Sequence, residues 1–311
     1  MDNVGLFFKF KVNRPLTEEE QQYQLKQDKR LDVGPLNQLS TIRMNSTYLE
    51  MVDKYYGWKG FLTLFSLVIV VIISGFLITL VSISVNRFDS LSADEKLEEI
   101  VFLAIFFLLF LPLLLVGVWL FLKEAFAYTH YPIRINRKNG KIYVFRLDGT
   151  ILSMPWRDVF FTVGKGRPRG SYDDIRGHVL DADGVTIQET FALSHFSGKD
   201  DPDLMQFWEY VRRYVEDGPA KLIPKIEHVI EISHKRETFW NGFHRLMAEM
   251  APIPVIAYLT APFWFVVAIF RYLAMRTSKI PQWPQWVEDE CQVDANDPYQ
   301  RDDLHPPPVV N

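Results

Sequence analysis

Two long apolar stretches without a charged residue, 60–85 and 100–122, dominate the hydrophobic pattern of the chain. A helix needs roughly 20 consecutive, mainly apolar residues to cross the hydrocarbon core of a bilayer, and both stretches reach this length. Long core helices of soluble proteins normally carry a polar face, which these stretches lack. A helix also pairs its own backbone groups, as lipid requires. The pattern therefore predicts a transmembrane helical hairpin over 60–122.

A third apolar stretch, 250–270, is interrupted by Pro252, Pro254 and Pro262. Proline removes a backbone donor and breaks or kinks a helix. Lys and Arg flank the stretch on both sides, so the charge pattern does not orient it. Three interpretations stay open: a third crossing or deep insertion, an interfacial or re-entrant helix, and a segment docked against the hairpin.

Basic residues gather at both ends of the predicted hairpin, whereas five of the seven charged residues in its connection, 86–99, are acidic. Cytoplasmic flanks of membrane helices collect Lys and Arg. We therefore expect the N-terminal segment, 1–59, and the residues after the hairpin to be cytoplasmic, with the connection on the other side. Tyr55, Tyr56 and Trp58 stand where an interfacial aromatic belt would anchor the first helix.

Residues 123–233 change to short alternating runs separated by turn residues, which is typical of antiparallel strands. Asn139-Gly140 and Asp183-Gly184 are pairs that favour tight hairpin turns, because both residues tolerate positive φ. Five or six strands are expected, most of them in one meander. Apolar residues then recur at helical spacing, which predicts a closing helix over 203–217 with Asp203 as its N-cap. This arrangement is similar to a pleckstrin-homology-type (PH-like) domain, so we expect an α+β membrane protein.

The two ends of the chain lie outside these predicted domains. Thr17 and Glu20 have the spacing of a capping box, which predicts a helix over 17–30. The acidic segment 288–311 ends in three consecutive prolines and a short apolar run, a composition typical of a disordered tail.

A basic, glycine-rich loop, 164–170, contains Lys165, Arg167 and Arg169. Cations near an anionic membrane are attracted to its headgroups, so these three residues are candidate lipid contacts. The alternative is a solvated loop without a ligand, because the negative charges of Asp173 and Asp174 follow closely and offset the positive charge of the loop. We interpret these two carboxylates as solvated. The spacing of a nucleotide-binding phosphate loop is missing.

An aromatic strip follows the third apolar stretch within the segment 234–287. Trp283 and Trp286 alternate there with Pro281 and Pro284. Such a strip can anchor at a membrane interface or dock a partner, and it can also pack against the protein's own domain.

No catalytic, metal or cofactor site is predicted. His228 and His234, with Glu231 between them, have even spacing, but a zinc site needs further ligands that the sequence does not nominate. Ser194 and His195 lack the sharp turn around a hydrolase nucleophile. Cys291 is the only cysteine, which excludes an intrachain disulfide. A net charge of −4 gives no general attraction to nucleic acid.

Several segments together resemble an uncharacterised family of proteobacterial integral membrane proteins that are often encoded beside type VI secretion effectors. The matching segments run through most of the chain and are Asn13-Arg14-Pro15-Leu16, Leu25-Lys26-Gln27-Asp28, Tyr48-Leu49-Glu50, Val52-Asp53-Lys54-Tyr55-Tyr56, Asn136-Arg137-Lys138-Asn139-Gly140, Phe239-Trp240-Asn241-Gly242-Phe243, and Thr277-Ser278-Lys279 followed by Pro281 and Trp283-Pro284. The resemblance implies a non-enzymatic immunity protein of the bacterial inner membrane that binds and neutralises a cognate toxin. The alternative is a membrane scaffold or anionic-lipid-binding protein that uses the PH-like domain. Neither interpretation indicates an oligomeric state.

Overall fold

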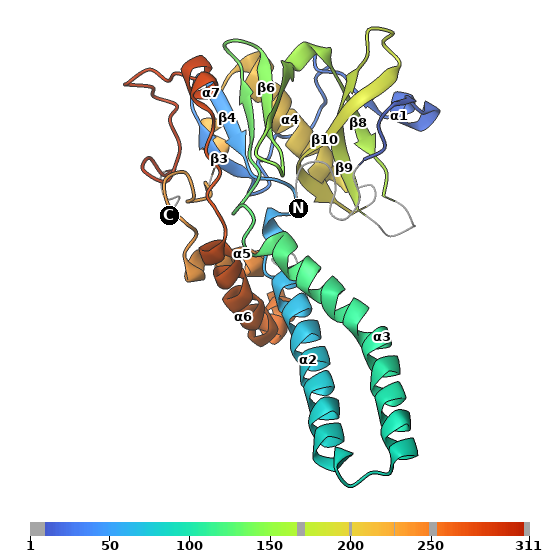
Figure 1. The fold of residues 1–311 in the computed structure, drawn as a ribbon. Helices are drawn as coiled ribbons and strands as arrows, with labels where there is room; N and C mark the ends of the chain where they lie inside the picture. Colours follow the sequence, from blue (N-terminus) through green and yellow to red (C-terminus); the bar gives the residue numbers. More distant parts are fainter. Residues whose placement is uncertain (1–9, 167–171, 199–200, 227, 249–253, 308–311) are drawn as a thin grey trace. The chain divides into compact units, whose positions relative to one another are not determined.

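The computed structural model describes residues 10–166, 172–198, 201–226, 228–248 and 254–307. The chain divides into two compact units (Figure 1). The first, the β-rich unit, combines residues 1–57, 128–237 and 280–311. The second, the helical unit, combines residues 58–127 and 238–279. Each unit is therefore assembled from segments that lie far apart in the sequence.

One five-stranded antiparallel sheet of the β-rich unit has the order β3-β4-β5-β6-β7. Its strands are β3 (Thr41–Met44), β4 (Tyr48–Met51), β5 (Ile133–Asn136), β6 (Lys141–Phe145) and β7 (Ile151–Pro155). The pair β4–β5 places Leu49 opposite Ile135, although the whole predicted membrane hairpin lies between them in the chain. Residues before and after that hairpin thus belong to the same sheet.

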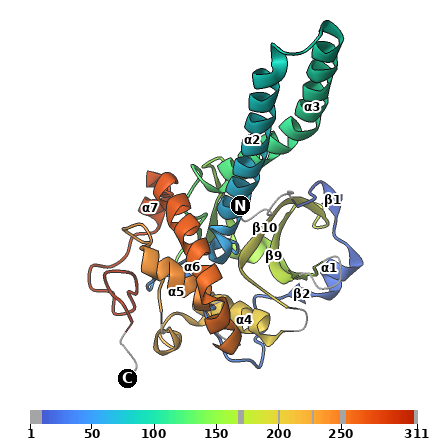
Figure 2. The same cartoon turned by 90° about the horizontal axis from the view of Figure 1, so that it is seen from below.

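The other five-stranded sheet has the order β1-β10-β9-β8-β2 and is strongly curved (Figure 2). Its strands are β1 (Arg14–Pro15), β2 (Gln24–Leu25), β8 (Val159–Gly164), β9 (Asp173–Leu180) and β10 (Thr186–Ser197). This unit also contains two short α-helices, α1 (Glu18–Gln22) and α7 (Gln285–Glu290), and two 3-10 helices, η2 (Trp156–Asp158) and η3 (Ile223–Lys225). A third 3-10 helix, η1 (Tyr56–Trp58), lies at the boundary between the β-rich and helical units. The predicted turns around Gly140 and Gly184 are confirmed, with positive φ at both glycines.

Helix α4 (Pro202–Asp217) joins the two sheets into one hydrophobic core. Its Trp208 ring lies 5.8 Å from that of Trp156 and 5.0 Å from that of Phe161. The closing helix is confirmed, but its N-cap is Asp201, whose side chain accepts from the Asp203 amide, with proline at the first helical position. The PH-like resemblance remains a prediction.

The N-terminal segment departs from the prediction. The capping box of Thr17 and Glu20 is present, yet α1 ends at Gln22 and the chain turns into β2. Residues 41–44 and 48–51 form two strands that we did not expect. Strand β3 pairs with β4, and β4 pairs with β5, so this segment is part of the β-rich unit.

The helical unit contains α2 (Phe61–Phe88), α3 (Ala93–Glu124), α5 (Phe239–Ala248) and α6 (Pro254–Thr277). Among the described residues, α2, α3 and α6 are long and apolar enough to cross a membrane. The two predicted spans are thus confirmed as helices. Helix α3 begins earlier than expected, because Ser92 and Glu95 form a capping box. Pro262 does not break α6, which continues through it.

Candidate functional site

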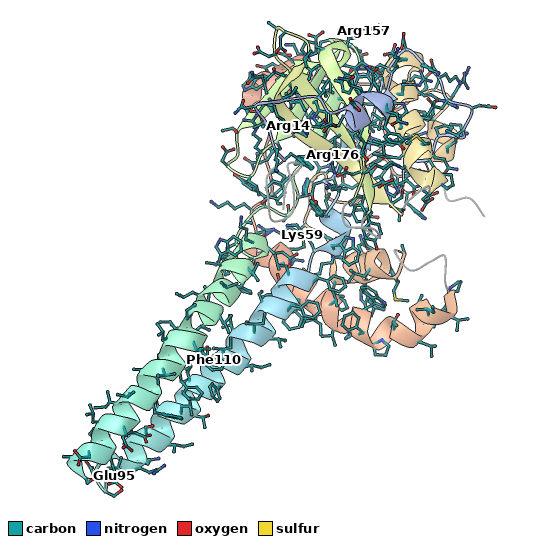
Figure 3. All side chains as sticks on the ribbon, turned by 90° about the vertical axis from the view of Figure 1, so that its right-hand side faces the viewer. Arg14, Lys59, Glu95, Phe110, Arg157 and Arg176 are labelled. Carbon is teal, nitrogen blue, oxygen red and sulfur yellow. The ribbon has the colours of Figure 1, made fainter. Side chains whose placement is uncertain are left out.

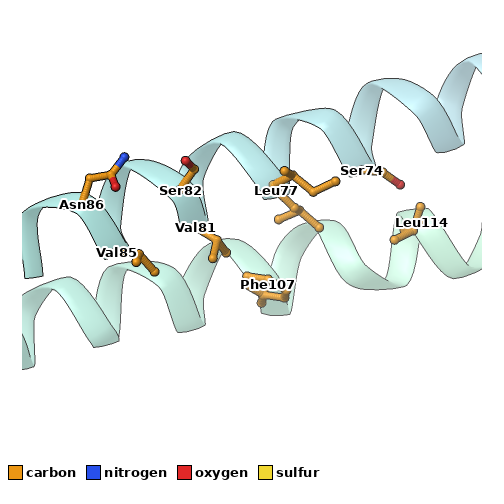
Figure 4. A pocket seen from close by; sticks show the side chains of 9 residues that line it. Ser74, Leu77, Val81, Ser82, Val85, Asn86, Phe107 and Leu114 are labelled. Atoms are coloured by element: carbon orange, nitrogen blue, oxygen red, sulfur yellow. The ribbon is translucent and has the colours of Figure 1, made fainter.

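A groove runs along one side of the α2–α3 hairpin (Figure 4). It encloses about 570 Å³ and is open along much of its length. Helix α2 supplies seven of its nine lining residues, at the spacing of one helical side: Ser74, Leu77, Ile78, Val81, Ser82, Val85 and Asn86. Helix α3 supplies Phe107 and Leu114. Most of the lining is apolar, which suits an apolar occupant.

The surfaces of both hairpin helices fit a lipid environment. Ile78 is 68% exposed and Leu108 is 80% exposed, although such side chains are normally buried in water-soluble proteins. Between the helices, the rings of Phe76 and Phe110 lie 5.0 Å apart, so a specific contact holds the pair together. Figure 3 labels Phe110 on the hairpin. Near the connection, Ser84 donates to Glu99 and satisfies a polar group at the end of the span.

A buried polar junction fixes the opposite end of the hairpin. Glu124, at the end of α3, accepts from the Thr63 amide at 2.7 Å and from the Thr63 hydroxyl at 2.6 Å. These groups lie in the first turn of α2, where a carboxylate is favoured by the helix dipole. The Ser278 hydroxyl, just after α6, donates to the backbone carbonyl of Glu124 at 3.2 Å. We did not predict this junction, because Glu124 simply follows the apolar run in the sequence.

Lys165 is engaged within the β-rich unit. Its Nζ lies 2.8 Å from Asp173 Oδ2 and 4.7 Å from the centre of the Tyr23 ring. Asp173 and Asp174 are each only 4% exposed, so our interpretation of these carboxylates as solvated was wrong. Asp174 pairs instead with Lys54 and, at 2.7 Å, with Arg176. Arg167 and Arg169 lie outside the described residues.

The three proposed aromatic anchors differ in exposure. Tyr56 is fully buried, and its hydroxyl donates to Glu237 at 2.8 Å, so it cannot reach lipid. Tyr55 is half-buried, with its ring 6.4 Å from that of Phe196. Trp58 is 39% exposed. Only Trp58 therefore retains a large exposed surface for an interface.

The aromatic strip packs on the sheet of the β-rich unit. The Trp283 ring lies 5.9 Å from that of Phe145, and the Trp286 ring lies 5.8 Å from that of Tyr143. Of the alternatives given for this strip, packing against the protein's own domain is therefore the one observed. Trp286 nevertheless remains 44% exposed.

The acidic tail is ordered as far as residue 307, contrary to our expectation. Glu288 pairs with Arg134 at 3.0 Å, Glu290 with Lys141 at 2.7 Å, and Arg301 bridges to Met44 in β3. The acidic residues therefore have basic partners on the sheet, and this pairing orders them. Residues 308–311 lie outside the described part of the chain.

Arg134 is the centre of this docking. Its guanidinium lies between the rings of Tyr48 and Trp283, 4.3 and 4.9 Å from their centres, and pairs with Glu50 at 2.7 Å. Burial alone would raise the pKa of Glu50, but the nearby Arg134 charge dominates and lowers it. Arg134 therefore holds the sheet and the C-terminal segment together.

A second buried charge cluster lies on the curved sheet. Both Nη atoms of Arg14 donate to Glu20, at 2.8 and 2.6 Å. Burial opposes ionisation of Glu20, but hydrogen bonds from Arg14 and Thr17 outweigh it and lower its pKa to about 2. Burial lowers the pKa of His178 to about 4, so its 3.5 Å approach to Glu20 is not an ion pair at neutral pH. The Arg14–Glu20 pair therefore joins β1 to α1 within the N-terminal segment.

The remaining polar candidates do not form a reactive site. No group of three metal-binding side chains is found in the part of the chain that the structure describes. His234 lies 2.7 Å from Asp303, while Glu231 pairs with Lys235. Ser194 is buried within β10, and the His195 ring packs 5.7 Å from Phe207.

Comparison with known proteins gives one match. No curated protein and no solved structure matches the chain. A protein family described as a family of unknown function matches residues 107–295, which is more than half of the sequence and covers most of α3, the strands that follow it, α4–α6 and α7. The chain therefore belongs to the DUF6708 family, a family of unknown function.

Proposed function

We propose that this chain is an immunity protein of the bacterial inner membrane, which binds and neutralises a cognate type VI secretion toxin and has no enzymatic activity. The observation that carries the proposal is the groove of the α2–α3 hairpin. A toxin segment inside the bilayer is apolar, and the groove offers an apolar surface on two helices that are long enough to cross the membrane.

The chemistry of the groove suits such a segment. Leu77, Val81 and Phe107 supply apolar contacts, while Ser82 and Asn86 supply hydrogen-bonding groups near the end of α2. Helix association in lipid depends on close packing and a few interhelical hydrogen bonds rather than on hydrophobicity alone. A partner helix or hairpin could obtain both kinds of contact here.

The charge pattern further supports a cytoplasmic position for the β-rich unit. Lys and Arg flank the hairpin on the side of this unit, and the acidic connection lies at its other end. With this unit in the cytoplasm, the α2–α3 hairpin would anchor the protein in the inner membrane and its short connection would lie outside.

The alternative, a scaffold that reads anionic lipid through the loop 164–170, is less favoured. Lys165 is already paired with Asp173 and packed on Tyr23, so it would have to leave both contacts to reach a headgroup. Arg167 and Arg169 are the remaining cations of the proposed lipid contact.

Filling the groove tests the proposal. Val81→Trp places a bulky side chain in it, and Ile83→Trp makes the same change on an exposed position of α2 outside the lining. Cells that also produce the proposed cognate effector should lose protection with Val81→Trp and keep it with Ile83→Trp, at equal amounts of protein in the membrane. Equal protection by both variants would refute the groove as the binding site.

A double variant, Arg167→Gln with Arg169→Gln, addresses the scaffold alternative. Toxin protection should survive this change. Loss of protection, together with loss of binding to anionic vesicles, would favour the lipid-reading function instead.

A further inference from the structure

The path of the chain through the β-rich unit limits how α6 can meet the membrane. The segment between Glu237 and Ile280 leaves this unit and returns to it. Before it, Glu237 accepts from Tyr56 of the same unit, and after it, Glu288 pairs with Arg134 on β5. A compact folded unit lies on one side of a bilayer, so the segment crosses an even number of times.

Helix α6 by itself is long enough for one crossing. Its 24 residues rise about 36 Å at 1.5 Å per residue, against a hydrocarbon core of about 30 Å. An even number would then require a second crossing by residues 238–253. Those 16 residues would rise about 24 Å even as one continuous helix, less than the hydrocarbon core, and they include Arg245 and Glu249. A second crossing by this short charged segment is therefore disfavoured.

The packing inside the helical unit agrees with this limit. Gly60, at the start of α2, lies against Arg271, while Phe61 lies 5.4 Å, ring to ring, from Trp264. Gly60 and Phe61 are neighbours in the chain, yet the α6 residues that they contact are seven positions apart. Helix α6 crosses the first turns of α2 instead of running along it, as Figure 3 shows for the orange and blue helices.

Helices α5 and α6 form a pair with an apolar outer surface. Leu246 of α5 packs against Val267 and Ala268 of α6, and the Phe239 ring lies 5.3 Å from that of Phe265. On the outside, the largest exposures include Tyr258 at 78%, Leu259 at 76%, Val255 at 71% and Trp240 at 59%. A contiguous apolar surface of this kind indicates contact with lipid or another apolar partner rather than with water.

We propose that α5 and α6 form a membrane-embedded wedge that enters one leaflet, on the side of the β-rich unit, and does not cross. Its partner is the lipid of that leaflet. The chain then crosses the bilayer only through α2 and α3, and both chain ends stay on the side of the β-rich unit. This inference is independent of toxin binding.

Single cysteines distinguish the wedge from a crossing helix. Val255→Cys lies in the first turn of α6, which a crossing helix would place in the far interface. Ser90→Cys in the α2–α3 connection marks the far side, and Ala182→Cys in the β9–β10 turn marks the near side. The native Cys291 is only 2% exposed, so labelling of the unsubstituted chain gives the background level. The probe is a membrane-impermeant maleimide added to sealed vesicles of each orientation.

In vesicles whose orientation allows labelling of Ser90→Cys, the wedge predicts that maleimide labelling of Val255→Cys stays at the background level. Addition of detergent should then allow full labelling of Val255→Cys. Labelling of Val255→Cys from the near side also supports the wedge. Labelling from the same side as Ser90→Cys would overturn it. Tyr258→Cys, one turn further along, repeats the test if Val255→Cys is produced poorly, with the same expected and contrary results.

Discussion

At the scale of single residues, Arg134 joins the sheet to the C-terminal segment through ion pairs with Glu50 and Glu288. It is 1% exposed, lies between two aromatic rings and neutralises Glu50, which is 5% exposed. Removing one partner of a buried ion pair leaves an uncompensated charge. An exposed pair contributes much less, because water and salt screen it. Glu288, whose side chain is 40% exposed, provides the contrast.

We therefore predict that Arg134→Ala lowers the free energy of unfolding by about 3–5 kcal/mol. Glu288→Ala should cost about 1 kcal/mol or less. Denaturant unfolding in detergent, followed by tryptophan fluorescence, measures both. Similar costs for the two variants would contradict the assignment of Arg134 as the centre of the docking.

The pH dependence of the same variant gives a second readout. In the unsubstituted chain the pKa of Glu50 is lower in the folded state than in the unfolded state. Ionised Glu50 therefore stabilises the folded state fully above its unfolded pKa near 4.5, and this stabilisation is lost as the pH falls through its folded pKa. Without Arg134, only Arg43 and the weaker effect of His130 oppose burial, so the pKa of Glu50 should rise and the variant should gain less stability than the unsubstituted chain as the pH rises. The cost of Arg134→Ala should accordingly shrink from pH 7 toward pH 4.

At the scale of the elements, the contact of α2 with α6 depends on Gly60. This residue has φ of +100°, and a Cβ there would lie 2.7 Å from the backbone nitrogen of Arg271. Neither helix can move away locally without losing the packing of Phe61 on Trp264. The sequence shows the glycine but not the neighbour that makes it necessary.

Gly60→Ala should therefore lower the free energy of unfolding by about 2 kcal/mol or more, from backbone strain and the collision with α6. Gly75→Ala is the matched control, because nothing lies within 4 Å of a Cβ added in the middle of α2. That variant should change stability by less than about 1 kcal/mol. Thermal unfolding in detergent measures both, and an unaffected Gly60→Ala protein would refute the close contact.

The elements that sequence patterns predicted well are those whose signal is local. Uninterrupted apolar runs located α2 and α3, and the glycines at 140 and 184 located two turns. Strands β3 and β4 were missed because β4 pairs with β5 across more than 80 residues, with Glu50 and Arg134 84 positions apart. The C-terminal acidic segment was misjudged for the same reason, since the Glu288–Arg134 pair spans 154 positions.

The candidate site was predicted only in outline. The sequence placed it in a membrane hairpin, but the groove depends on how α2 and α3 are rotated against each other, which apolar runs do not specify.

The proposed lipid-contact residues illustrate the opposite error. Lys165 stands in a basic loop by sequence, yet Asp173, eight positions later, neutralises it. A charge count along the chain cannot distinguish a free cation from a paired one.

At the scale of the whole molecule, every interpretation depends on α2 and α3 crossing the bilayer as a hairpin. The pairing of β4 with β5 supports this topology independently of hydropathy, because it keeps both ends of the hairpin in one sheet. The exposed apolar side chains of both helices then face lipid rather than water. A crossing hairpin predicts that its connection and the β-rich unit are accessible from opposite sides of the membrane.

Protease-site insertion tests this claim most directly. One variant carries the recognition sequence of a site-specific protease between Asp89 and Ser90, and another carries it between Ala182 and Asp183. The protease is added outside sealed vesicles of a single orientation. The hairpin predicts that only one of the two variants is cut, and that vesicles of the opposite orientation reverse the result. Cutting of both variants from the same side would contradict the membrane hairpin.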